Sequence, residues 1–131
     1  MVRAGSGVST VNADEIIRYA LWTTAVFNLG GALLFAFPDS LGGIAGFPGH
    51  VPRVYSSLLA LFVILFGGAY AWLARQPSIN RPFVAFAAIG KAGAFAVVLA
   101  CFLAGDVPLL SVAAISGDLV FALVFAWWLF R

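Results

Sequence analysis

Charged side chains are scarce in this sequence. Seven basic and five acidic residues make up 9% of its 131 positions, whereas soluble globular domains carry about 25% charged residues. So few charges could not solvate the surface of a small soluble globule. The basic residues are also scattered along the chain rather than gathered in one patch, so we expect no nucleic-acid partner.

Residues that usually carry catalysis or bind metals are equally few, with one cysteine and one histidine in the chain. Cys101 has no partner for an internal disulfide and lies in an apolar run, so we interpret it as a small core residue. His50 has no cysteine or acidic residue beside it that would complete a metal site. No phosphate-binding glycine loop, H-E-x-x-H or G-x-S-x-G motif occurs. We therefore expect no metal and no cofactor, and we lean against an enzyme.

Long apolar runs, in contrast, dominate the chain. Hydrophobic residues make up 63% of the sequence, and four runs reach the roughly 18 residues that mark a membrane span. We expect spans at about residues 16–37, 54–74, 82–104 and 108–130. The connections between them are short, which favours antiparallel neighbours. The predicted fold is therefore all-α: an integral membrane protein built as an up-down four-helix transmembrane bundle.

This bundle would form a single domain over residues 14–131. Residues 1–13 contain glycine and serine but no apolar core of a secretory signal, and we expect them to be a flexible tail. The connection at residues 38–53 is rich in proline and glycine. Leu41, Ile44 and Phe47 recur in it at helical spacing, so we expect this loop to lie in the membrane interface with these side chains pointing inward.

The distribution of arginines predicts the orientation. Four spans place both termini on the same side of the membrane as the turn near residue 78. The arginines of that side are Arg3, Arg18, Arg75, Arg81 and Arg131, whereas the opposite side has Arg53. The positive-inside rule then places both termini in the cytoplasm. Tryptophans, which prefer the interface, lie near the same ends of the spans: Trp22, Trp72, Trp127 and Trp128.

Polar residues within the spans are the best pointers to function, because they are costly in lipid. The candidates are Lys91, Asp118, Asn28, Tyr70, Thr24 and Ser116. Lys91 and Asp118 lie in adjacent antiparallel spans with an axial offset of about 4.5 Å. Their side chains lean in opposite directions, so direct pairing requires the lysine to curl back. Asn28 matches Asp118 better in depth, and Tyr70 is a second partner for Lys91.

These polar residues have more than one interpretation. They could hold the helices together, at about 0.6 kcal/mol per contact, or form a site for a ligand, ion or proton. Lys91 could also extend alone toward the interface. Small residues, such as Gly30 with Gly31 and Gly90 with Gly93, would allow close helix packing within one bundle or at an oligomer seam.

Around Gly90-Lys91 and Gly117-Asp118 the chain resembles the small four-helix bacterial membrane proteins grouped as DoxX-like. The likeness lies in the size, the number of spans and a Gly-Lys pair inside a span. In those proteins the pair tends to lie in an earlier span than the third, so no functional residue is carried over. The resemblance implies the bacterial inner membrane and an accessory part in redox or quinone chemistry.

Three functions are compatible with these features. The first is a non-enzymatic module that binds a lipid-like or small ligand, or a partner helix, in a cavity lined by Lys91, Asp118 and Asn28. The second is a subunit of an oligomeric small transporter or channel. The third is an accessory subunit or enzyme of lipid or quinone redox chemistry. The expected partners are membrane lipids and either further copies of the chain or another membrane protein.

Overall fold

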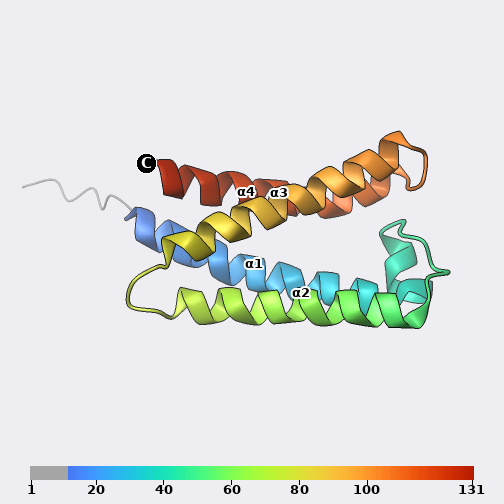
Figure 1. Cartoon of the computed structure of the whole chain (residues 1–131), viewed down its shortest axis with the longest axis horizontal. Helices are drawn as coiled ribbons and strands as arrows, with labels where there is room; N and C mark the ends of the chain where they lie inside the picture. Colours follow the sequence, from blue (N-terminus) through green and yellow to red (C-terminus); the bar gives the residue numbers. More distant parts are fainter. Residues whose placement is uncertain (1–11) are drawn as a thin grey trace, which may run out of the picture.

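The computed structural model describes residues 12–131, and within that range the long elements are all helices (Figure 1). They are α1 (Ala13–Ala36), α2 (Arg53–Ala74), α3 (Arg81–Leu103) and α4 (Leu109–Phe130). Each has 22–24 residues and is apolar enough to cross a membrane. At 1.5 Å per residue such helices are about 33–36 Å long, which is sufficient for a hydrocarbon core of about 30 Å. The predicted all-α four-helix membrane bundle is confirmed, and the chain is a multi-pass membrane protein.

The helix ends follow local sequence signals. Asn12 caps α1, because its side-chain oxygen accepts a hydrogen bond from the backbone N–H of Asp14 at 3.2 Å. Asn80 caps α3 in the same way, through the N–H of Phe83 at 2.9 Å. The predicted tail, residues 1–13, lies outside the described residues except at its end, where Ala13 already belongs to α1.

The helices form two hairpins, α1–α2 and α3–α4, which are joined by the packing of α1 against α4. One end of the bundle carries residue 12, Arg131 and the turn at residues 75–80, and we call it the terminal end. The other carries residues 37–52 and the turn at residues 104–108, and we call it the loop end. Figure 1 shows that α3 diverges from α2 toward the loop end.

The hydrophobic core occupies the terminal half of the bundle. Its buried residues are Ile17, Leu21, Tyr70, Leu73, Ala74, Val84, Ala87, Phe125 and Trp128. Here α2 and α3 meet through aromatic rings: the Phe66 and Phe86 centroids lie 5.9 Å apart, and those of Tyr70 and Phe83 lie 6.1 Å apart. Beyond Lys91, by contrast, no described residue of α3 is buried. The two hairpins are therefore packed tightly at the terminal end and separated at the loop end.

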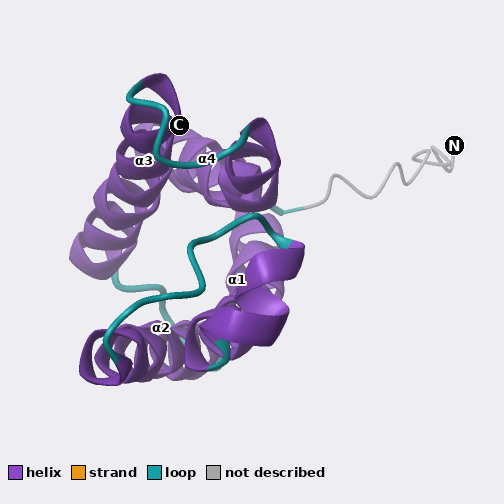
Figure 2. Cartoon of the chain, turned by 90° about the vertical axis from the view of Figure 1, so that its right-hand side faces the viewer, coloured by secondary structure: helices purple, strands orange, loops and turns teal. Residues whose placement is uncertain are grey.

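The loop at residues 37–52 crosses the space between the hairpins, as Figure 2 shows from the loop end. It begins with a π-helical turn, Pro38–Gly42, and is tied to α4 because the Ser111 hydroxyl donates to the carbonyl of Ala45 at 3.0 Å. Gly46 has φ +75°, and a Cβ there would stand 2.6 Å from Cγ of Pro108, so this close approach requires glycine.

The three apolar residues of this loop are not equally covered by the bundle, and their insertion into the membrane interface stays a prediction. Leu41 and Phe47 are half-buried, whereas Ile44 is 71% exposed. Ile44 directly precedes Ala45, whose carbonyl is tied to α4, and its own side chain points away from the bundle.

Candidate functional site

A buried polar cluster lies at the level where the two hairpins separate. The ammonium nitrogen of Lys91 lies 2.5 Å from Oδ1 of Asp118 and 2.6 Å from Oδ1 of Asn28. All three side chains are buried. Lys91 and Asp118 thus pair directly across the α3–α4 hairpin, although their side chains were expected to lean apart. Asn28, however, binds Lys91 rather than Asp118.

Asn28 extends this cluster to the fourth helix. Its side-chain nitrogen donates to the carbonyl of Val63 in α2 at 3.0 Å. The approach is close because α2 has Gly67 at this level, where an added Cβ would lie 3.1 Å from Cβ of Asn28. A chain of polar contacts therefore connects α4, α3, α1 and α2 in the interior, where lipid offers no competing hydrogen bonds.

Aromatic rings surround the remaining side of the Lys91 ammonium. The nitrogen lies 5.3 Å from the ring centroid of Phe27, 5.6 Å from that of Tyr70 and 5.8 Å from that of Phe121. Rings at such distances attract a cation through their negative faces. Tyr70 is therefore a partner of Lys91 as predicted, although the contact is made by the ring face.

The other two predicted residues lie differently. Thr24 is one turn from Asn28 on the same face of α1 and is fully buried, and its hydroxyl has no hydrogen-bond partner in the described chain. Ser116 is exposed and donates to the carbonyl of Ala113 at 2.6 Å. Thr24 thus borders the cluster, whereas Ser116 faces away from it.

An apolar cavity of about 320 Å³ opens between the hairpins, on the loop side of the cluster. We call it the inter-hairpin cavity. Its walls are Phe27, Gly30, Gly31 and Leu34 of α1 together with Ala114 and Ile115 of α4, and Phe35 and Phe47 close it toward the loop end. None of the six predicted polar residues, all within the described chain, lines it. Phe27 separates the cavity from Lys91, because its ring contacts both.

Sequence reasoning did not find this cavity, although one signal was present. The pair Gly30 and Gly31 predicts close helix packing, but an added Cβ on Gly30 would meet no atom within 4 Å. Gly30 therefore leaves open space on the cavity wall, whereas Gly31 also packs on α2, where an added Cβ would lie 3.5 Å from a side-chain carbon of Val63. A small residue can mark a cavity as well as a contact, and only the neighbouring helix decides between the two.

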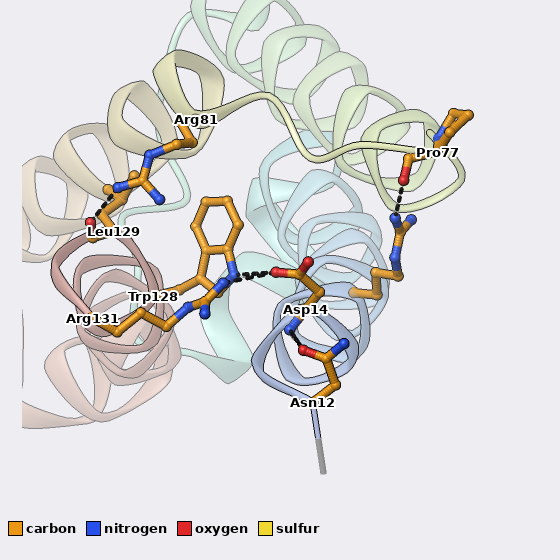
Figure 3. Close-up of polar contacts among 8 residues, drawn as sticks. Asn12, Asp14, Pro77, Arg81, Trp128, Leu129 and Arg131 are labelled. Atoms are coloured by element: carbon orange, nitrogen blue, oxygen red, sulfur yellow. Dashed lines mark hydrogen bonds and ion pairs between the residues drawn. The ribbon is translucent and has the colours of Figure 1, made fainter. Parts of the chain in front are cut away.

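The terminal end of the bundle is closed by a second polar network (Figure 3). The carboxylate of Asp14 accepts hydrogen bonds from Nε1 of Trp128 at 3.0 Å and from Arg131 at 2.8 Å. The Trp128 ring also lies 5.2 Å from the guanidinium of Arg81. Because of these contacts Trp128 is buried, unlike Trp22, Trp72 and Trp127, which are exposed in the manner expected of interface residues.

Two of the arginines also satisfy the carbonyls at helix ends. Arg18 donates to the carbonyls of Ala74, Gln76 and Pro77 at 2.6–3.0 Å. Arg81 donates to the carbonyl of Leu129 near the end of α4. Cations are stabilised at helix C-termini, where backbone carbonyls lack partners. Arg18 thus ties α1 to the end of α2 within the first hairpin, and Arg81 ties α3 to α4 within the second.

The fold and the site together define a small polytopic membrane protein with a closed terminal end, a buried polar cluster and an apolar cavity. Among residues 12–131, no group of three His, Cys, Asp or Glu side chains could hold a metal ion. Comparisons with protein-family models, with curated proteins and with solved structures found no match.

Proposed function

We propose that this protein is a non-enzymatic membrane module that binds the apolar chain of a lipid-like ligand in the inter-hairpin cavity. The observation that carries this proposal is the cavity itself. Its volume of about 320 Å³ lies at the lower end of the range for small-ligand sites, roughly 300–1,000 Å³. The Lys91 cluster would then hold the hairpins at the spacing that keeps the cavity open.

The chemistry of the walls supports an apolar occupant. The lining side chains are phenylalanine, leucine, isoleucine, alanine and glycine, so they offer hydrophobic contact and no hydrogen bond. The cavity lies between α1 and α4, within the length of helix that would span the hydrocarbon layer. A ligand that enters it must therefore come from the lipid phase, and its polar head must stay outside the walls.

The polar cluster is better suited to structure than to ligand recognition. Lys91 already has two oxygen partners and a surrounding of rings, and Asp118 is only 5% exposed. Removing one partner of a buried ion pair is costly, because the other charge is left uncompensated. A ligand that displaced Asp118 from Lys91 would have to overcome that cost.

Filling the cavity tests the proposal. Gly30→Leu places a side chain in open space on the cavity wall, whereas Gly68→Leu does the same on α2, away from the cavity. We expect lipid-like molecules to copurify with the wild type and with Gly68→Leu in native mass spectrometry, and to be lost from Gly30→Leu. Equal occupancy in all three proteins would refute a ligand in this cavity.

We also propose that both termini face the cytoplasm and that the membrane is a bacterial inner membrane. The excess of arginine at the terminal end and the exposure of Trp22, Trp72 and Trp127 at that end support this orientation. The inner membrane rests on the resemblance to DoxX-like proteins, as does any accessory part in quinone chemistry.

A second candidate is a subunit of an oligomeric transporter or channel. The observation that favours it is the loop half of α3, in which no described residue is buried and Gly93 has no neighbouring atom around its missing Cβ. Gly93→Leu would disrupt helix packing by another copy at this face. A defined oligomer in detergent that dissociates in Gly93→Leu would support the second candidate, and a monomer in both would oppose it.

A further inference from the structure

A second apolar cavity, of about 170 Å³, lies under the loop between α1 and α2. It shares three walls with the inter-hairpin cavity, namely Leu34, Phe35 and Phe47. Val51 and Leu59 belong to its remaining wall. We call it the sub-loop cavity. The two spaces therefore lie end to end along the last turns of α1, with common residues between them.

Phe47 is the one residue of this shared wall that comes from the loop. Its ring packs edge-on against that of Phe35, with centroids 5.6 Å apart. Phe35 belongs to α1, whereas Phe47 belongs to the loop, directly after Gly46 with φ +75°. The loop backbone is held by the bond from Ser111 to the carbonyl of Ala45 and by the bond from the N–H of Phe47 to the carbonyl of Gly42. These bonds hold the loop backbone in place, and the side chain of Phe47 forms part of the wall common to both cavities.

The sizes of the cavities restrict the ligand. A water-sized group occupies ~30 Å³, so the inter-hairpin cavity holds about ten such groups. That is enough for one short apolar chain and too little for the two chains of a membrane phospholipid. The sub-loop cavity would hold about six more groups at ~30 Å³ each.

The polar side chains of the sub-loop cavity, Tyr55 and Ser56, both come from the start of α2, and Ser56 already donates to the carbonyl of Arg53.

From this arrangement we infer that the site takes up one apolar chain of an amphiphile, and that Phe47 determines the length of chain that the protein accepts. The inference rests on the proposed function. With Phe47 in place the chain ends at the ring and fills the inter-hairpin cavity alone. Without the ring the two cavities join, and a longer chain extends into the sub-loop cavity.

Chain-length selectivity provides the test. Straight-chain fatty acids of increasing length are titrated into the detergent-purified protein, and binding is measured by native mass spectrometry. In the wild type each added methylene should tighten binding about fourfold until the cavity is full, and further carbons should not. In Phe47→Ala the longest chain that still gains affinity should be about six carbons longer, given ~30 Å³ per group. Phe47→Leu should show a smaller shift.

The matched control is Ile44→Ala, which removes an exposed apolar side chain from the same loop and should keep the wild-type length preference. Unchanged preference in Phe47→Ala and Phe47→Leu, with fatty acids still bound, would overturn the role of Phe47 and leave the proposed function intact. Absence of binding to the wild type at every length would overturn both. If Phe47→Ala does not fold, Phe47→Leu decides alone.

Discussion

A Cβ atom at position 117 would stand 2.6 Å from Cε2 of Phe27 and 2.8 Å from its Cζ. Gly117 therefore lets the Phe27 ring lie directly on the backbone of α4. The same ring faces the Lys91 ammonium and lines the inter-hairpin cavity. One glycine thus positions the ring that divides the polar cluster from the cavity.

Gly117→Ala should accordingly destabilise the protein. Phe27 cannot move without disturbing Lys91 or Phe121, whose ring lies 5.5 Å from that of Phe27. Overpacking of this kind costs about 1–3 kcal/mol, which thermal unfolding in detergent would reveal as a lower midpoint. Gly93→Ala is the control, because its new methyl group meets no atom within 4 Å. Equal midpoints for the two variants would contradict the close contact between Gly117 and Phe27.

Lys91 and Asp118 should contribute to the stability of the protein as a coupled pair. Lys91→Met leaves the carboxylate buried without its counter-charge, and Asp118→Leu does the same to the ammonium. Each single variant should therefore lower thermal stability, and the double variant should recover part of the loss. The double-mutant cycle should give a coupling of about 0.5–3 kcal/mol, the usual range for residues in contact. Strictly additive losses would show that the two residues do not interact.

At the terminal end, the hydrogen bond from Trp128 to Asp14 should contribute more to the stability of the fold than the ion pair of Asp14 with Arg131 does. The ion pair is half exposed, and such pairs contribute about 0–1 kcal/mol. Asp14→Asn keeps an oxygen acceptor for the indole and should therefore leave the stability nearly unchanged. Asp14→Leu removes the acceptor of the buried Trp128 and should cost about 1–3 kcal/mol. Thermal unfolding of both variants measures the difference. A larger loss of stability in Asp14→Asn than in Asp14→Leu would show that the ion pair, and not the hydrogen bond, is the more important contact.

The proposed orientation predicts the side on which Arg131 lies. A reporter enzyme that is active only in the cytoplasm, fused after Arg131, should be active. A reporter that is active only outside the cytoplasm should be silent at the same position. The reverse pattern would overturn the orientation, because residue 12, Arg131 and the turn at residues 75–80 lie at the same end of the bundle.

The spans could be predicted from the sequence because the information is local. A run of about 20 apolar residues is long enough to cross the bilayer whatever it packs against, and Asn12 and Asn80 act within one turn of the helices they begin. The identity of the interior polar residues was also evident. Lys91, Asp118 and Asn28 were costly in lipid wherever they pointed, so an inward position was the physically reasonable expectation.

The partners of those residues were decided only by the tertiary structure. The similar depths of Asn28 and Asp118 along their helices predict that these two residues are partners. In the structure, the rotation of each helix and the length of the lysine side chain place the ammonium of Lys91 between them instead. The cavity depends on the same long-range geometry. Gly30 is equally compatible with close packing and with open space, and the divergence of α3–α4 from α1–α2 makes it open. Composition and hydropathy determine which segments lie in the membrane, whereas the crossing of the two hairpins determines what those segments enclose.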